Sequence, residues 1–257
     1  MLQLNKIYCM DCIEGMKKLD DKSIDMILCD LPYGTTACKW DTIIPFKPLW
    51  EQYKRIIKYN GTIVLTASQP FTSALVMSNI KMFKYSLVWW KKGTNAGFAQ
   101  APYKFLKVHE DIVIFSYGGT SKNATIRMTY NPQGLKDCSV LIKGRTESSH
   151  RVGRRKQENY YQKKTCYPKS ILIFNEDKQW LHPTQKPLSL FEYFIKTYSN
   201  EGEIVLDNCI GSGTTAVACK QLNRRFIGFE IIQEYVNAAN KRLMNTIRYP
   251  SLDDWKI

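Results

Sequence analysis

Two short segments of the sequence combine residue types that can bind a nucleoside and act on an aromatic ring. In the first, residues 206–216, Gly211 and Gly213 follow an apolar run that ends at Asp207. Glycines let the backbone approach a ligand where a Cβ atom would clash. Glu230 ends the next apolar run, where a carboxylate can accept hydrogen bonds from ribose hydroxyls. This pattern predicts a nucleoside pocket.

The second segment is Asp30-Leu31-Pro32-Tyr33, which follows an apolar run over 24–29. It offers a carboxylate, a stiff backbone with a carbonyl group, and an aromatic face. Such a set suits a flat ring with an amino group, because the aromatic face can stack on the ring while the oxygens accept the amino hydrogens. The same four residues are also compatible with an ordinary turn after a strand.

The elements around these segments alternate between strands and helices. Apolar runs predict strands over 24–30, 62–67, 85–90, 112–115, 204–207 and 226–230. Helical spacing predicts helices over 12–19, 48–59, 70–80, 188–199, 214–222 and 233–244. The alternation predicts an α/β fold with a mostly parallel sheet. Because ligands bind at the carboxyl ends of such strands, both segments should face one crevice.

Composition narrows the class of protein. The 257 residues are 44% hydrophobic and 23% charged, which is typical of a globular chain that buries a core. Lys and Arg number 37 against 23 acids, so the net charge of +14 makes nucleic acid a candidate partner. With no signal-like segment and no apolar run near ~18 residues, we expect a cytoplasmic protein without a membrane partner.

The eight cysteines are scattered, and only Cys9 and Cys12 form a close pair. A zinc site needs about four ligands, so we predict no metal site.

The middle of the chain is strongly basic. Residues 136–170 hold ten Lys and Arg against three acids, with weak periodicity. We interpret 93–180 as an insertion into a core formed by 1–92 and 181–257, with one further core strand near 109–117. A solvated basic loop is the alternative. The residues expected to bind DNA phosphates are Lys143, Arg145, Arg151, Arg154, Arg155, Lys156, Lys163 and Lys164.

Four motifs, in order, resemble those of the β-class amino DNA methyltransferases, which use S-adenosylmethionine. The Asp30 segment resembles the catalytic Asp-Pro-Pro-Tyr of that family. Residues 10–14 with 23–25 resemble the preceding segment, and 182–187 resemble the segment that closes the methionine end of the cofactor pocket. Residues 207–215 with Glu230 resemble the cofactor loop and its ribose acid. The resemblance covers about 1–117 and 180–245.

The resemblance implies a Rossmann-like S-adenosylmethionine-dependent methyltransferase fold with a circularly permuted motif order, and a target-recognition role for the basic middle. It implies transfer of a methyl group to N6 of an adenine flipped out of duplex DNA, with Asp30, Leu31, Pro32 and Tyr33 as catalytic residues. Asp rather than Ser at position 30 favours adenine. Two departures stand out, because Leu31 replaces a proline and Asn208-Cys209 replaces Pro-Phe.

The resemblance also implies roles in cofactor binding. Glu230 would hold the ribose, Asp207 the loop or the methionine amine, and Asp11 the adenine end. Lys186 or Thr184 would meet the methionine carboxylate. Asp11 is equally compatible with a helix cap, and Lys186 with a solvated lysine. The full predicted set is Asp11, Asp30, Thr184, Lys186, Asp207, Cys209, Gly211, Ser212, Gly213, Thr214, Thr215 and Glu230.

Several alternatives stay open on sequence alone. The substrate could be N4 of cytosine, or RNA, and a non-catalytic DNA-binding protein could keep the same pocket. Gly-x-Gly-x-x-Ala also fits a dinucleotide fingerprint, although too little chain follows Glu230 to supply the further strands of a dinucleotide fold. Duplex DNA is the expected partner, and the resemblance is compatible with a homodimer and a cognate restriction endonuclease.

Overall fold

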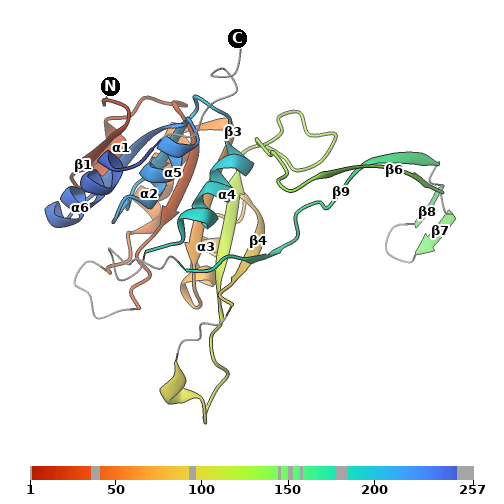
Figure 1. Cartoon of the computed structure of the whole chain (residues 1–257), viewed down its shortest axis with the longest axis horizontal. Coiled ribbons are helices and arrows are strands. Elements are labelled where there is room, and N and C mark those ends of the chain that lie inside the picture. Colours follow the sequence, from red (N-terminus) through yellow and green to blue (C-terminus); the bar gives the residue numbers. More distant parts are fainter. Residues whose placement is uncertain are drawn as a thin grey trace. The chain divides into compact units, whose positions relative to one another are not determined.

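The computed structural model describes residues 2–35, 41–92, 97–143, 146–149, 153–156, 159–176 and 185–247 (Figure 1). The chain divides into two compact units. The core unit consists of Met1–Asn131 and Ser170–Ile257, and the small unit of Pro132–Lys169. All residues of the predicted catalytic and cofactor sites belong to the core unit.

The core unit contains an eight-stranded sheet in the order β1-β12-β11-β2-β3-β5-β4-β10. The strands are β1 (Lys6–Cys9), β2 (Ile24–Asp30), β3 (Ile57–Ala67), β4 (Phe83–Trp90), β5 (His109–Ser116), β10 (Ile171–Ile173), β11 (Ile204–Asp207) and β12 (Arg225–Glu230). Strand β5 is antiparallel to both β3 and β4, and the other neighbouring pairs are parallel. The predicted mixed α/β architecture with a mostly parallel sheet is confirmed.

Helices cover both faces of the sheet (Figure 1). They are α1 (Cys12–Lys17), α2 (Phe46–Ile56), α3 (Phe71–Ser78), α4 (Leu188–Tyr198), α5 (Thr214–Gln221) and α6 (Gln233–Met244). Successive side chains of a strand point to opposite faces, so Met26 and Leu28 pack with α4, α5 and α6, while Ile27 and Cys29 pack with α1, α2 and α3. Burial on both faces explains why Met26–Cys29, the middle of β2, is an unbroken apolar run.

The two ends of the chain meet in the middle of the sheet. Strand β2 pairs with β11, with Met26 opposite Val205 and Ile27 opposite Leu206. Because the two strands are parallel, Asp30 and Asp207 at their carboxyl ends lie at the same edge of the sheet. This pairing places the two segments singled out in the sequence side by side.

Strand β3 begins at Ile57, earlier than the predicted strand over 62–67. Asn60-Gly61 was expected to end a helix over 48–59, but α2 ends at Ile56 and both residues lie within β3. The pairing of β2 with β3 shifts register between Ile24 and Met26. A Cβ atom on Gly61 would lie 2.8 Å from the Asp25 carbonyl oxygen, so glycine permits this close approach.

The small unit contains two hairpins. Strand β6 (Lys136–Ile142) pairs with β9 (Tyr160–Thr165), and β7 (Thr146–Ser149) pairs with β8 (Gly153–Lys156), both antiparallel. The small unit, 132–169, lies within the predicted insertion of 93–180. Strand β5 lies where a further core strand was predicted near 109–117, and β10, which was not predicted, also belongs to the core sheet. In the part of the chain that the structure describes, no helix is long and apolar enough to cross a membrane.

Candidate active site and cofactor pocket

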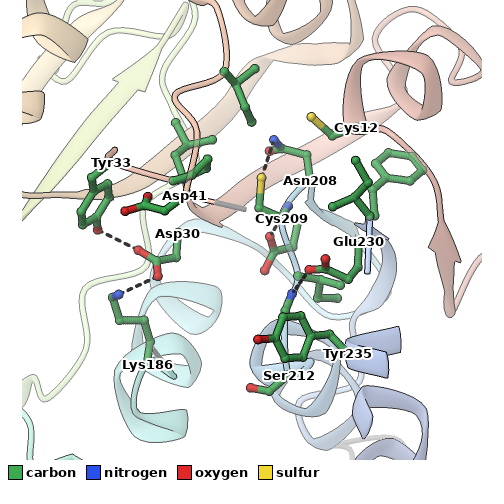
Figure 2. Close-up of a pocket in the computed structure, with 18 of the residues that line it drawn as sticks. Cys12, Asp30, Tyr33, Asp41, Lys186, Asn208, Cys209, Ser212, Glu230 and Tyr235 are labelled. Atoms are coloured by element: carbon green, nitrogen blue, oxygen red, sulfur yellow. Dashed lines mark hydrogen bonds and ion pairs between the residues drawn. The ribbon is translucent and has the colours of Figure 1, made fainter. Parts of the chain in front are cut away.

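One pocket of about 660 Å³ opens at the carboxyl ends of the central strands. Asp30 and Tyr33 line it after β2, Asp207 and Gly211 after β11, and Glu230 after β12. In Figure 2, Asp30, Tyr33 and Lys186 lie on one side of this pocket, and Glu230, Ser212 and Tyr235 lie on the other. The sheet thus brings the predicted catalytic segment and the predicted cofactor loop into a single cavity.

Three side chains hold the carboxylate of Asp30. The Tyr33 hydroxyl donates to Oδ1 over 2.7 Å, and the Thr66 hydroxyl on β3 donates to the same oxygen. The Lys186 ammonium lies 2.6 Å from Oδ2 (Figure 2). The carboxylate orientation is therefore set from two sides before any substrate binds.

Lys186 is buried, with an exposed side-chain fraction of 7%. Its ammonium also lies 3.5 Å from Oε2 of Glu110, and Glu110 in turn pairs with Lys91 over 2.7 Å. Burial alone would lower the pKa of Lys186, but the charges of Asp30 and Glu110 raise it above its ordinary value. Lys186 is therefore a buried cation, not a solvated lysine. It contacts Asp30, and the contact with the methionine carboxylate that the resemblance implies stays a prediction.

Tyr33 is oriented by an aromatic neighbour as well as by Asp30. Its ring stacks on that of Phe71, the first residue of α3, with centroids 5.2 Å apart and an angle of 30°. Asp41 holds the backbone that directly follows Tyr33. Its two carboxylate oxygens accept the backbone N–H groups of Gly34 and Thr35, each over 2.9 Å. The predicted stacking of Tyr33 on a target base stays a prediction.

The cofactor loop is organised around Asp207. This carboxylate is 3% exposed, and it accepts the backbone N–H of Cys209 over 3.1 Å and the hydroxyl of Thr215. Burial raises the pKa of Asp207 to about 7, and both hydrogen bonds oppose that rise. Gly213 has a φ of +81°, and a Cβ atom there would lie 2.8 Å from Cβ of Ala239 on α6. Asp207 thus fixes the geometry of the loop.

Glu230 joins the end of β12 to the same loop. Its Oε2 accepts the backbone N–H of Gly211 over 3.0 Å, and its Oε1 accepts that of Ile232 over 2.9 Å. Burial raises the pKa of Glu230, and these backbone hydrogen bonds oppose the rise. A carboxylate has about four acceptor sites, so two hydroxyl groups can still donate to this side chain.

Asp11 caps α1, and Oδ1 accepts the backbone N–H groups of Ile13 and Glu14 over 2.9 and 3.1 Å. The capping role considered for Asp11 is therefore present. Because Asp11 also lines the pocket, its contact with an adenine ring stays a prediction.

The Asn208-Cys209 departure has a structural account. Asn208 is buried, and its Oδ1 accepts the Tyr53 hydroxyl of α2 over 2.5 Å, which ties the loop to a helix on the opposite face of the sheet. Asn208 also donates to the sulfur of Cys209 over 3.5 Å. Nearby Cys29 is fully buried, and burial raises the pKa of its thiol to about 12, so this thiol is neutral.

The remaining predicted site residues make fewer contacts with the pocket or lie in other parts of the chain. The Ser212 hydroxyl lies 3.4 Å from Oε1 of Gln185, and the Thr214 hydroxyl accepts a hydrogen bond from Arg242. Lys143, Lys163 and Lys164 are exposed in the small unit. Thr184, Arg145 and Arg151 lie outside the described residues, and so do the side chains of Arg154, Arg155 and Lys156.

Several site residues were not found from the sequence. Thr66, Asp41 and Glu110 belong to no recognisable motif. Asp41 and Glu110 line the pocket, and Thr66 contacts Asp30 from the neighbouring strand. Tyr235, the third residue of α6, lines the pocket beside Glu230 (Figure 2). The sequence offers one indication for Tyr235, which is its position five residues after Glu230 at the end of β12.

A glycine loop and a carboxylate at the ends of neighbouring strands are typical of nucleoside-binding α/β proteins. Comparison with known proteins identifies the family. Residues 24–241 match the N6/N4 methyltransferase family of DNA methylases. The chain therefore belongs to the amino DNA methyltransferases, as its motif order indicated.

Relatives of known name agree with this assignment. The Type II methyltransferase M1.MboII of Moraxella bovis is 29% identical over 93% of this chain and 96% of its own length. The Type II methyltransferase M.HpaI of Haemophilus parainfluenzae is 28% identical over 97% of this chain and 77% of its own length.

Solved structures share the fold. M1.HpyAVI, solved in complex with SAM, has a TM-score of 0.60 and 26% identity, and the match covers 93% of this chain and 99% of that one. The cytosine-N4-specific PvuII DNA methyltransferase has a TM-score of 0.66 at 15% identity, covering 94% of this chain and 87% of its own. The second likeness shows the fold alone. The fold is thus that of S-adenosylmethionine-dependent DNA methyltransferases.

Proposed function

We propose that this DNA methyltransferase transfers the methyl group of S-adenosylmethionine to the exocyclic N6 of an adenine flipped out of duplex DNA. The observation that carries the proposal is the position of Asp30, which lines the same pocket as Glu230 and the glycine loop. A carboxylate that accepts amino hydrogens and a pocket that holds a nucleoside are the two parts that such a transfer requires.

The residues present fit S-adenosylmethionine. Glu230 keeps acceptor sites for ribose hydroxyls while two backbone N–H groups fix its orientation. The positive φ of Gly211 and Gly213 brings backbone close to the space in front of β11. When bound, the cofactor supplies an electrophilic methyl group on a sulfonium. The chain supplies the pocket, the orientation and the groups that receive the amino hydrogens.

Asp30 acts on the nucleophile. The adenine amino nitrogen is a poor nucleophile because its lone pair is delocalised into the ring. Oδ1 of Asp30 already accepts two hydroxyl groups, whereas Oδ2 accepts only the Lys186 ammonium among the interactions identified. The amino N–H is therefore directed to Oδ2, and the Leu31 carbonyl accepts the second N–H. Both contacts favour a pyramidal nitrogen, and positioning and electrostatics supply most of the rate.

The Lys186–Glu110–Lys91 chain of charges supports that carboxylate. Because Lys186 is paired with two acids, it balances the negative charge of Asp30 without placing an uncompensated cation beside the reacting nitrogen. Asp30 need not remove a proton beforehand, since the proton can leave after the transfer. The target atom is inaccessible within a duplex, so the adenine must leave the base stack.

Expression of the chain in a bacterium that lacks its own DNA methylation tests the proposal. Sequencing that detects modified bases should find N6-methyladenine at one short site, and nothing in cells that express Asp30→Ala. N4-methylcytosine at the mapped site would overturn the choice of base. The absence of any modified base would overturn the proposed activity on DNA. A homodimer and a cognate endonuclease stay predictions.

A further inference from the structure

The segment between β4 and β5 exposes three large aromatic side chains. Among the residues of this aromatic loop, which we define as residues 97–108, Phe98 is 76% exposed, Tyr103 is 87% exposed and Phe105 is 99% exposed. The loop includes the short helical turn η1 (Phe98–Gln100), and in Figure 1 it is the yellow segment that extends beyond the sheet. Burying one such side chain is worth about 1.5–3 kcal/mol, so its exposure suggests a partner.

The aromatic loop arises from the rim of the catalytic pocket. Strands β3 and β4 are both antiparallel to β5, so β4 ends at the same edge of the sheet as Asp30. The Lys91 N–H donates to the Val108 carbonyl over 2.9 Å and closes the base of the loop. Lys91, Lys107 and Glu110 all line the pocket. The base of the aromatic loop therefore lies at the rim of the pocket that holds Asp30.

The positive charge around the aromatic loop indicates which kind of partner it binds. Residues 91–108 contain four lysines and no acid, and of these Lys91 is paired with Glu110 and Glu176. Lys104 lies between Tyr103 and Phe105, so cation and aromatic alternate on the same segment. Basic side chains bind phosphates, and aromatic side chains stack on bases regardless of sequence. A second copy of this basic chain would bring like charges together, whereas a nucleic acid is complementary.

We propose that the aromatic loop enters duplex DNA at the target base and that Phe105 occupies the space the flipped base leaves, with Phe98 against the neighbouring bases. The inference rests on the proposed function, because it requires a flipped base. A flipped base leaves its former neighbours unstacked, and an apolar side chain inserted into the stack restores part of that contact. Lys104, between Tyr103 and Phe105, then meets an adjacent phosphate.

The test compares Phe105→Ala and Phe98→Ala with the wild-type protein on two duplexes that carry the site mapped by sequencing. One duplex is fully paired, and the other has an abasic residue opposite the target, so that flipping requires no base pair to open. Met77→Ala is the control, because Met77 is a 72% exposed side chain in the last turn of α3. Fluorescence of 2-aminopurine at the target position reports flipping directly.

On the paired duplex, Phe105→Ala should lower kcat/KM by about 10-fold or more, as expected for the loss of one aromatic–base stack. It should also remove most of the fluorescence rise. On the abasic duplex the loss should shrink to about 2-fold. Cofactor affinity and Tm should not change, because Phe105 packs against nothing in the free protein.

Three results would overturn the inference. They are an equal loss on both duplexes, unchanged kinetics in both loop variants, and a change of oligomeric state in Phe105→Ala, which would assign the loop to a contact between copies. A wild-type protein that transfers no methyl group to either duplex would instead overturn the proposed function on which the inference rests.

Discussion

At the scale of single residues, the proposed catalysis depends on how the carboxylate of Asp30 is held. Its contacts with Tyr33 and Thr66 are local to the sheet edge, whereas Lys186 reaches it from a segment distant in the chain. A buried cation between two acids is stable only while all three charges are present. The charges around Asp30 therefore link the stability of the core unit to the catalytic geometry.

Replacement of Lys186 by Met should destabilise the protein by about 3 kcal/mol, because Asp30 and Glu110 lose the cation between them. The double variant Lys186→Met, Glu110→Gln should regain part of that stability without regaining activity. Urea unfolding measures the first effect and methyl transfer the second. A single variant as stable as the wild type would show that Lys186 does not compensate these acids.

Asp207 should give the stability a pH dependence of its own. Burial raises its pKa from 3.8 to about 7, so the folded protein holds the proton more tightly than the unfolded chain. The contribution is fully present below about pH 4 and is lost as the pH rises through about 7. Relative to Asp207→Asn, the free energy of unfolding of the ligand-free wild type should fall by about 3 kcal/mol from about pH 5 to about pH 8. Parallel profiles in urea unfolding would contradict this.

At the scale of elements, the pocket is made by the ends of β2, β11 and β12 and by the glycine loop that packs on α6. These elements are predictable, because strands buried on both faces are continuous apolar runs and the helices between them show helical spacing. Strand β1 was missed because it has four residues, is largely exposed and lies at the sheet edge. The start of β3 was missed because the strand contains an asparagine and a glycine.

Gly213→Ala tests the contact between the glycine loop and α6. A Cβ atom would meet Ala239 at 2.8 Å and would also sit at a φ of +81°. Gly202→Ala is the matched control, since its φ is +76° and nothing lies within 4 Å of its Cβ position.

The backbone strain of about 1–2 kcal/mol is common to both glycine variants. Gly213→Ala should therefore be the less stable of the two in urea unfolding, and it alone should lose cofactor affinity in calorimetric titration. Equal effects would show that the loop has room to shift away from α6.

At the scale of the whole molecule, the chain combines a core unit that contains the proposed active site with a basic small unit. The motif order, the sheet and most of the pocket followed from local patterns. The small unit did not, because its strands are short and mostly exposed, and the apolar run in β6 is only three residues long. The contacts of Thr66 and Glu110 could not be predicted either, since each depends on pairing between distant segments. Asp41 bonds to Gly34 and Thr35, only six or seven residues away, but no motif marks this contact.

The small unit should supply phosphate contacts. Lys163 is exposed, whereas Lys164 pairs with Asp137 over 2.6 Å, so the two neighbours form a matched pair. Lys163→Ala should reduce the slope of log affinity for DNA against log salt by about 1, and Lys164→Ala should change it less. Cofactor affinity should be unchanged in both. Identical slopes for Lys163→Ala and the wild type would remove Lys163 from the DNA contact surface.

In the proposed reaction, Asp30 accepts one amino hydrogen of adenine while the methyl group is transferred. The most direct test is transfer of label from S-adenosylmethionine to unmodified genomic DNA, followed by digestion and nucleoside chromatography, with the wild type and Asp30→Ala side by side. The wild type should yield labelled N6-methyladenine. Asp30→Ala should be slower by at least about 100-fold while still binding the cofactor. Full transfer by Asp30→Ala, or label on cytosine N4, would contradict the account.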